Sequence, residues 1–196
     1  DLNLAIALAT RDELVRHGVE VKMSRTKDEN DTLSEEIREA ISYRPTLAID
    51  IHNNAGGGDG AEVFHHHGGG LSETAAKLIL GEITKIGQNS RGAKTKKNSS
   101  GNDYYYFIRE TAAPAVIVEC AFVDNKTDVK IIDTKAEQTA MGTAIAKGIL
   151  KTLGISASDK LYRVQVGAYG IRRNAEEMQR KLKDAGFPAI ITEVKL

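Results

Sequence analysis

The sequence contains one cysteine, three prolines and no tryptophan. A single cysteine, Cys120, cannot form an internal disulfide, so the fold does not depend on disulfide bonds. Charge of one sign is also lacking, because 27 basic residues balance 27 acidic residues. This balance argues against a nucleic-acid-binding protein, which carries a basic excess to neutralise phosphates. No apolar run reaches the roughly 18 residues of a membrane span, so no such span is expected.

The composition is that of a folded protein. Hydrophobic residues make up 41% of the 196 residues and charged residues 28%, which excludes a disordered chain. Five segments have helical periodicity, and two of them begin with a capping box, formed by Thr32 with Glu35 and by Thr134 with Glu137. Helices are expected at residues 1–17, 32–43, 72–87, 134–154 and 172–185.

The remaining apolar segments have the lengths and patterns of strands. Their alternation with helices predicts an α/β fold: a mostly parallel sheet flanked by helices on both faces, with a small C-terminal βαβ fragment. A parallel α/β domain usually opens on a strand, whereas this chain opens on a helix. Residues 88–103 are polar and are expected to form a surface loop. Strands are expected at residues 19–23, 47–52, 61–65, 115–120, 161–168 and 189–194.

Two polar residues stand where buried strands end. His52 ends the strand 47–51, and Glu119 lies near the end of the strand that begins at Ala115. In open α/β sheets, sites gather at the carboxyl ends of strands. A histidine there suits a zinc ligand, and a nearby glutamate can take a proton from water. Alternatively, His52 caps its strand by a hydrogen bond and Glu119 pairs with a lysine or arginine.

Other conspicuous residues carry less chemistry. The run His65-His66-His67 is not expected to bind one ion, because adjacent residues of an extended segment point to opposite faces. We expect it to form a surface rim near the substrate. Cys120 points away from the Glu119 face and belongs in the core. The glycine runs lack the context of a phosphate-binding loop, and no Gly-x-Ser-x-Gly elbow of a serine hydrolase is present.

Six stretches, taken in order, resemble the zinc-dependent N-acetylmuramoyl-L-alanine amidases with a type-3 catalytic domain. The resemblance covers residues 1–155, which we interpret as the amidase catalytic domain. The stretches are Asp1-Leu2-Asn3-Leu4-Ala5-Ile6-Ala7, Gly18-Val19-Glu20-Val21-Lys22-Met23-Ser24-Arg25, Ile51-His52-Asn53-Asn54-Ala55, Gly60-Ala61-Glu62-Val63-Phe64, Ile108-Arg109-Glu110-Thr111 and Pro114-Ala115-Val116-Ile117-Val118-Glu119-Cys120-Ala121-Phe122.

The resemblance implies a site. In this family two histidines and a glutamate hold Zn²⁺; His52 matches one ligand, and Glu119 matches the catalytic acid/base. The other two ligands lie ahead of the helix that begins this chain, so we expect the domain to lack its first strand and two zinc ligands. Asn54 and Arg109 are weaker candidates for binding substrate.

The C-terminal residues resemble a second family. Residues 161–196 are similar to one βαβ half of a sporulation-related (SPOR) repeat, a module that binds glycan strands of peptidoglycan. Residues 156–160 are small and polar, which is typical of a linker. A generic βαβ appendage is the alternative interpretation.

Together the two resemblances imply a cell-wall hydrolase that cleaves the amide bond between N-acetylmuramic acid and L-alanine. The implied partner is bacterial peptidoglycan, both stem peptide and glycan strand. The implied place of action is the bacterial cell wall, reached by an exported autolysin or by a phage lysin released at lysis. The alternative is a non-catalytic peptidoglycan-binding protein built on an inactive or truncated amidase scaffold. The oligomeric state is left open.

Overall fold

The computed structural model describes residues 2–29, 32–156, 165–187 and 189–194. The chain forms two compact units, Asp1–Ala157 and Ser158–Leu196. Within the described residues, no helix has the length and apolar character needed to cross a membrane. Most of the expected linker at residues 156–160 lies outside the described residues.

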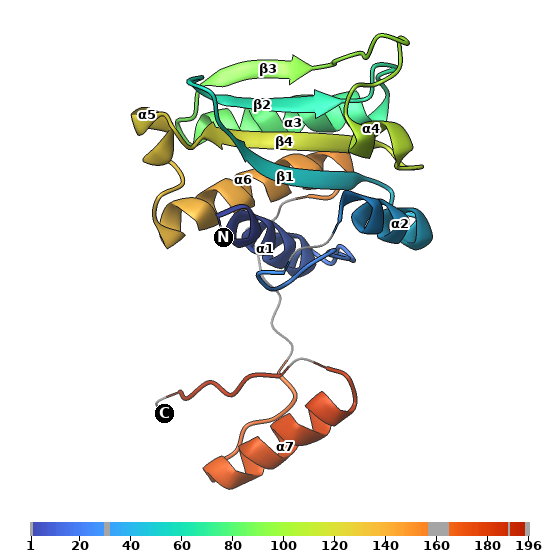
Figure 1. The fold of residues 1–196 in the computed structure, drawn as a ribbon. Coiled ribbons are helices and arrows are strands. Elements are labelled where there is room, and N and C mark those ends of the chain that lie inside the picture. Colours follow the sequence, from blue (N-terminus) through green and yellow to red (C-terminus); the bar gives the residue numbers. More distant parts are fainter. Residues whose placement is uncertain (1, 30–31, 157–164, 188, 195–196) are drawn as a thin grey trace. The chain divides into compact units, whose positions relative to one another are not determined.

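A four-stranded sheet forms the centre of the first unit (Figure 1). Its order is β1-β4-β2-β3, with β1 parallel to β4, β2 parallel to β3, and β2 antiparallel to β4. The expected α/β fold is therefore confirmed, and the sheet is mixed. The strands are β1 (Ala48–Asn54), β2 (Ala61–His65), β3 (Ser90–Lys94) and β4 (Ala115–Phe122); the helices are α1 (Leu2–Arg16), α2 (Leu33–Tyr43), α3 (Leu71–Lys85), α4 (Tyr106–Glu110), α5 (Lys126–Val129) and α6 (Lys135–Thr152).

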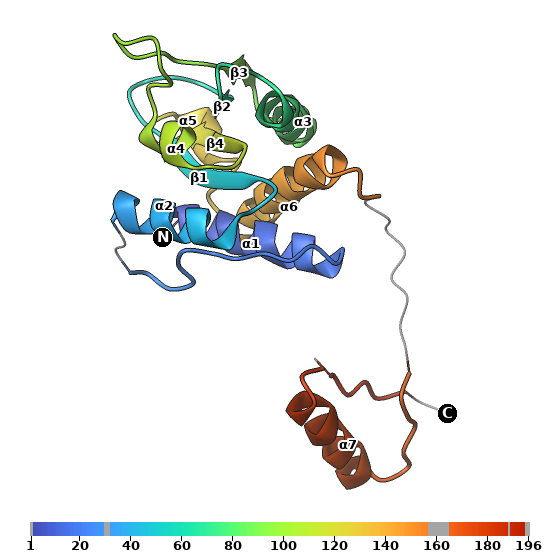
Figure 2. The same cartoon turned by 90° about the vertical axis from the view of Figure 1, so that its right-hand side faces the viewer.

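Successive residues of a strand point to opposite faces of the sheet. Both faces of this sheet are apolar, and helices cover both of them. Val116, Val118 and Cys120 of β4 pack in a large core with α1, α3 and α6. Ala115 and Ile117 point the other way, into a smaller core that includes residues of α2 and α4. Figure 2 views the strands end-on, with α3 and α6 on one side and α4 on the other. The Cys120 side chain is fully buried in the large core, as expected.

Local signals placed the helix starts accurately. Both predicted capping boxes form: the Thr32 side chain accepts a hydrogen bond from Glu35 N, and that of Thr134 from Glu137 N. Each glutamate in turn accepts from the backbone N–H of its threonine, at 2.8 Å and 2.7 Å. The caps fix where α2 and α6 begin, since they satisfy N–H groups that lack partners in the first helical turn.

In the first unit, the short helices α4 and α5 were not expected, and two further segments differ from the expectation. Residues 19–23 are not a strand, although Val19 and Val21 still pack against the large core. A strand needs a partner for its backbone groups, and none of the described strands pairs with this segment. The expected loop 88–103 contains β3, which pairs with β2 at the sheet edge. The sequence of β3 is polar and therefore does not predict a strand, because polar and charged residues are common on edge strands.

The second unit contains one helix, α7 (Arg172–Asp184), close to the predicted range. None of its described residues is buried. The strands expected around it are not formed in the described residues 165–168 and 189–194, and residues 161–164 lie outside the description. Of the predicted βαβ fragment, the described residues therefore contain the helix and neither strand. A two-stranded pairing is marginal by itself in water, which accounts for the difference.

Candidate active site

Two neighbouring strands bring His52 and Glu119 together. Because β1 and β4 are parallel, their carboxyl ends meet, and His52 lies directly opposite Glu119 in the register. On the other side of β4, Glu62 of β2 is also opposite Glu119. Asp50 precedes His52 by two residues and so shares its face. Four titratable side chains thus occupy adjacent positions on the face that carries α2 and α4.

The His52 ring is held by two neighbours. Its Nε2 lies 2.9 Å from Asp50 Oδ1, and its Nδ1 lies 3.4 Å from the amide nitrogen of the Asn3 side chain. The hydrogen bond that His52 donates to Asp50 raises the pKa of His52; burial opposes this shift, and the charges of Asp50 and Glu119 add to it. The side chain remains 47% exposed. An ordered imidazole that is still accessible suits metal ligation or proton transfer.

Glu119 has an unusual environment for a carboxylate. Its Oε2 is buried and has no hydrogen-bond partner in the described part of the chain. Burial raises the pKa of this carboxyl, while His52 lowers it and the charges of Asp50 and Glu62 raise it further. Buried polar atoms are nearly always paired, so the free oxygen points to a missing ligand such as water, metal or substrate. A raised carboxyl pKa also suits general acid–base catalysis at neutral pH.

Glu62 is a site residue that the sequence did not single out. It is 5% exposed and accepts hydrogen bonds from Arg91, Lys94 and the Asn54 side chain. Burial raises its carboxyl pKa, but the hydrogen bonds of Lys94 and Arg91 outweigh burial and lower it. Glu62 is therefore held ionised beside Glu119. The sequence signal was only a charged residue inside the expected strand 61–65; that all five residues of this strand are buried is known from the structure.

A groove of approximately 1050 Å³ opens beside these strands. Its lining includes His52, Asp50, Glu119, Asn3 and Tyr105, together with apolar residues of α1 and of the segment 19–23. It runs along β1, the strand at the edge of the sheet. A groove with an apolar wall and a few convergent polar groups is the usual form of a ligand site.

The two predicted substrate-binding residues lie outside the lining of this groove. Asn54 follows His52 on β1 but donates to Glu62 Oε1 at 3.1 Å. Arg109 donates from Nη1 to the carbonyl oxygens of Asp103 and Tyr104, and its guanidinium lies 5.3 Å from the centre of the Tyr106 ring. The structure thus brings together His52 and Glu119, places Asn54 beside them, and ties Arg109 to the segment before α4.

The described residues do not complete a zinc centre at His52. Zinc sites need three protein ligands or more, and among the described residues this site offers only the imidazole of His52 and the carboxylate of Asp50, because Glu119 is the candidate acid/base and not a ligand. The chemistry of the donors is appropriate, because Glu119 keeps a free buried oxygen. Within the described residues, the close group of three potential ligands lies elsewhere, at His66, His67 and Asp103.

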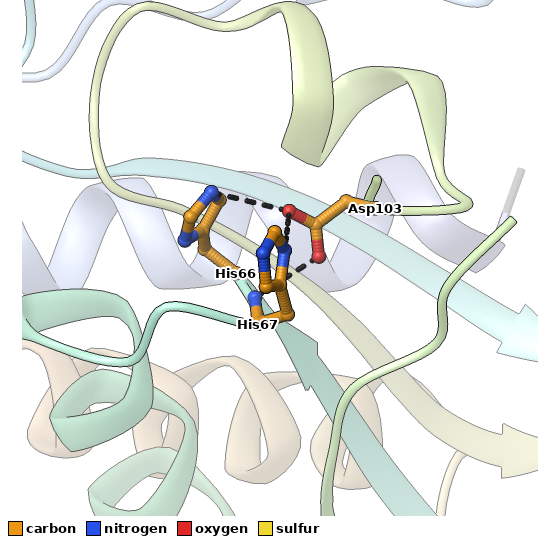
Figure 3. Close-up of side chains that lie close together, drawn as sticks. All are labelled: His66, His67 and Asp103. Carbon is orange, nitrogen blue, oxygen red and sulfur yellow. Dashed lines mark hydrogen bonds and ion pairs between the residues drawn. The ribbon is translucent and has the colours of Figure 1, made fainter. Parts of the chain in front are cut away.

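Figure 3 shows this second group, with both rings turned toward Asp103. His66 Nε2 and His67 Nδ1 lie 3.2 Å and 2.8 Å from the same atom, Asp103 Oδ2. The three consecutive histidines do not converge, as expected, because the His65 ring bonds to the carbonyl of His66. Two of them do converge, however. The alternation argument fails for this pair because β2 ends at His65 and the chain turns.

Comparison with known proteins decides the family. The family model described as N-acetylmuramoyl-L-alanine amidase matches residues 1–151. The chain belongs to this family. The SPOR domain model matches residues 151–195. His52 and Glu119 both lie within the residues that match the amidase family model.

The relatives described next match between 76% and 97% of this chain. N-acetylmuramoyl-L-alanine amidase CwlM of Bacillus licheniformis is 31% identical over 195 residues, which are 97% of this chain and 74% of that protein. The structure of Cwp6 from Clostridium difficile is 37% identical with a TM-score of 0.75, over 76% of this chain and 24% of Cwp6. The catalytic domain of CwlV from Bacillus (Paenibacillus) polymyxa var. colistinus has the same fold, with a TM-score of 0.70 and 24% identity over 79% of this chain and 84% of that domain.

Proposed function

We propose that this chain is a peptidoglycan amidase that hydrolyses the bond between the lactyl group of N-acetylmuramic acid and L-alanine of the stem peptide. The observation that carries this proposal is the buried, unpartnered Glu119 Oε2 beside His52 in the groove of an amidase-family fold. A water molecule between Glu119 and a bound amide would satisfy that oxygen.

Glu119 is proposed to act first as base and then as acid. It accepts a proton from water as the water oxygen attacks the amide carbon. It then gives the proton to the alanine nitrogen as the carbon–nitrogen bond breaks. The products are the lactyl carboxylate of the glycan and a stem peptide with a free amino terminus. Burial and the neighbouring carboxylates raise the pKa of Glu119, which makes its carboxylate a stronger base in the first half of the reaction.

His52 is proposed as a ligand of the family's zinc ion. When bound, zinc would lower the pKa of a coordinated water from about 15.7 toward 7. The described residues supply too few ligands at His52, so the proposal requires further ligands. Asp50 orients the imidazole through its 2.9 Å contact. Asn54 and Arg109 remain proposed substrate-binding residues. Asn54 is proposed because it lies two residues after His52 on β1. Arg109 is proposed because its guanidinium holds the backbone of Asp103 and Tyr104, just before α4.

The test is release of new N-terminal alanine from purified peptidoglycan, measured with added zinc and with a strong chelator. We expect release that the chelator stops. Glu119→Gln should reduce release about 100-fold or more while leaving bound zinc unchanged. Glu73→Gln is the matched control, because Glu73 is a partly exposed carboxylate on α3 whose partner is Lys77. Wild-type activity in Glu119→Gln would contradict the assigned role.

The alternative is a peptidoglycan-binding protein without catalysis, built on the same amidase scaffold. In that case no alanine is released at any zinc concentration, yet the chain still sediments with insoluble peptidoglycan. Release of alanine by the wild-type chain would exclude this alternative, and absence of release would overturn the amidase proposal.

The second unit is proposed to bind glycan strands, and the protein is proposed to act at the bacterial cell wall. The match of residues 151–195 to the SPOR domain supports this role. Truncation after Ser156 should weaken sedimentation with peptidoglycan stripped of its peptides. Equal sedimentation of the full and truncated chains would contradict it.

A further inference from the structure

The His66, His67 and Asp103 group lies at the opposite end of the sheet from the amidase site. In the antiparallel pairing of β2 with β4, Glu62 faces Glu119, whereas His65 faces Val116. Glu62 and His65 are therefore three residues apart along β2, which corresponds to about 10 Å. The group begins beyond His65, so the proposed catalytic groove and this group cannot share an ion.

The spacing of the three side chains matches a metal site. The distances from Asp103 Oδ2 are 3.2 Å to His66 Nε2 and 2.8 Å to His67 Nδ1, and all three ligand atoms lie within 4.8 Å of one another. Tetrahedral zinc with bonds of about 2.0–2.1 Å places its ligand atoms about 3.3 Å apart. The present arrangement thus needs only small side-chain shifts to surround an ion.

The carboxylate is fixed in place before any ion binds. Asp103 is 2% exposed, and its Oδ1 accepts a hydrogen bond from His67 N at 3.0 Å. Arg109 donates to the backbone carbonyl of Asp103 at 2.8 Å. Such outer contacts orient metal ligands and strengthen binding. The imidazoles are accessible, with side chains 47% exposed for His66 and 31% for His67, so an ion and a fourth, water ligand can enter.

The protons of the rings can be accommodated. Gly68 N–H donates to His66 Nδ1, so the ring proton of the neutral form is on Nε2, toward Asp103. A metal at Nε2 requires that proton on Nδ1, and Gly68 is exposed, so its N–H can bond to water instead. His67 likewise keeps one proton on Nε2 when Nδ1 binds the ion. Both imidazoles stay neutral, as metal ligation requires.

We propose that His66, His67 and Asp103 form a zinc site of their own, with water in the fourth position. The ion would join the turn after β2 to the segment that precedes α4. That segment also carries Tyr105, whose ring contacts Phe64 at a centroid distance of 4.7 Å and lines the amidase groove. The site would therefore hold in place one wall of the groove without taking part in the reaction.

Zinc binding to the full chain in a His52→Ala background tests this proposal, because that change removes the imidazole of the amidase site. We expect about one zinc ion per chain after equilibrium dialysis at neutral pH. Adding His66→Gln, or His66→Gln with His67→Gln, should weaken binding at least about tenfold. His65→Gln is the matched control from the same tripeptide and should bind as its parent does. His66→Gln alone alters an exposed side chain, so a loss of folding does not obscure the result.

Hydrogen exchange gives a second readout that is independent of catalysis. Zinc should slow exchange of amides in residues 96–105 of the His52→Ala chain, and should have no such effect once His66 and His67 are replaced. The proposal is overturned if His52→Ala binds no zinc, or if His66→Gln with His67→Gln binds as much zinc as His65→Gln. Amidase activity does not enter either measurement, so this proposal and the proposed function can fail separately.

Discussion

Gly148 allows α6 to pack directly on α3, and a single methyl group added there tests this contact. A Cβ at position 148 would lie 2.4 Å from Ile79 Cα and 2.7 Å from Ile79 N. Those are backbone atoms within α3, so they cannot rotate away. Non-bonded carbon atoms prefer about 3.5–4.0 Å, so the helices would have to separate by about 1 Å. Ile79 and its neighbour Ile145 are fully buried, and separation would loosen their packing.

The cost of Gly148→Ala follows from two opposing effects. Overpacking of a core costs about 1–3 kcal/mol, and contact with rigid backbone puts this case near 3 kcal/mol. Alanine is a better helix former than glycine by about 1 kcal/mol. The net loss in free energy of unfolding is about 2 kcal/mol. For a unit of this size each kcal/mol changes Tm by roughly 2–4 °C, so we expect a decrease of roughly 4–8 °C.

Gly81→Ala is the matched control, because Gly81 lies in α3 and a Cβ there meets no atom within 4 Å. It gains helix propensity without a clash and should raise Tm by roughly 2–4 °C. Thermal unfolding of the full chain, followed by circular dichroism, measures both changes. The reasoning is refuted if Gly148→Ala unfolds at or above the wild-type temperature while Gly81→Ala is stabilised as expected.

Two further predictions concern buried carboxylates. Asp128 is fully buried, and its Oδ2 accepts hydrogen bonds from Gly60 N and Phe122 N. Asp128→Ala leaves both buried N–H groups without a partner, so it should lower the free energy of unfolding by about 3 kcal/mol. Urea denaturation measures this change, and a loss under about 1 kcal/mol would contradict the prediction. Burial raises the pKa of Glu82, but hydrogen bonds from Lys151 and Lys85 outweigh burial and hold the pKa below the ordinary 4.5. Its stabilisation is therefore present above pH 4.5 and is lost as pH falls through the lowered pKa. Glu82→Gln should cost about 0.5–1 kcal/mol at pH 7, a difference that should vanish in strong acid; a difference that persists there would exclude the ion pair as its source.

Much of the fold was predictable because its signals are local. The capping boxes at Thr32 and Thr134 specify helix starts through contacts between residues three apart. The apolar strands β1 and β4 were visible as short buried runs. β3 was missed because its strand character comes from pairing with β2, not from its own residues. The segment 19–23 shows the converse, since its alternation is strand-like but no described strand pairs with it.

Some residues of the candidate site could likewise be placed from the sequence, and others could not. His52 and Glu119 could be placed together from the sequence, because parallel strands bring their carboxyl ends to one edge. Glu62 could not, since its nearness to Glu119 depends on β2 running antiparallel to β4. The convergence of His66 and His67 on Asp103 depends on a turn and on a residue 36 positions away.

The amino-acid sequence by itself determined the five longer helices, the apolar strands and the family, because each rests on patterns read within a few residues; α4 and α5 are too short to show a periodicity. Only the tertiary structure decided the strand order, the buried free oxygen of Glu119 and the second cluster of potential ligands. These depend on which distant segments lie side by side, and that is set by the packing of helices on both faces of the sheet.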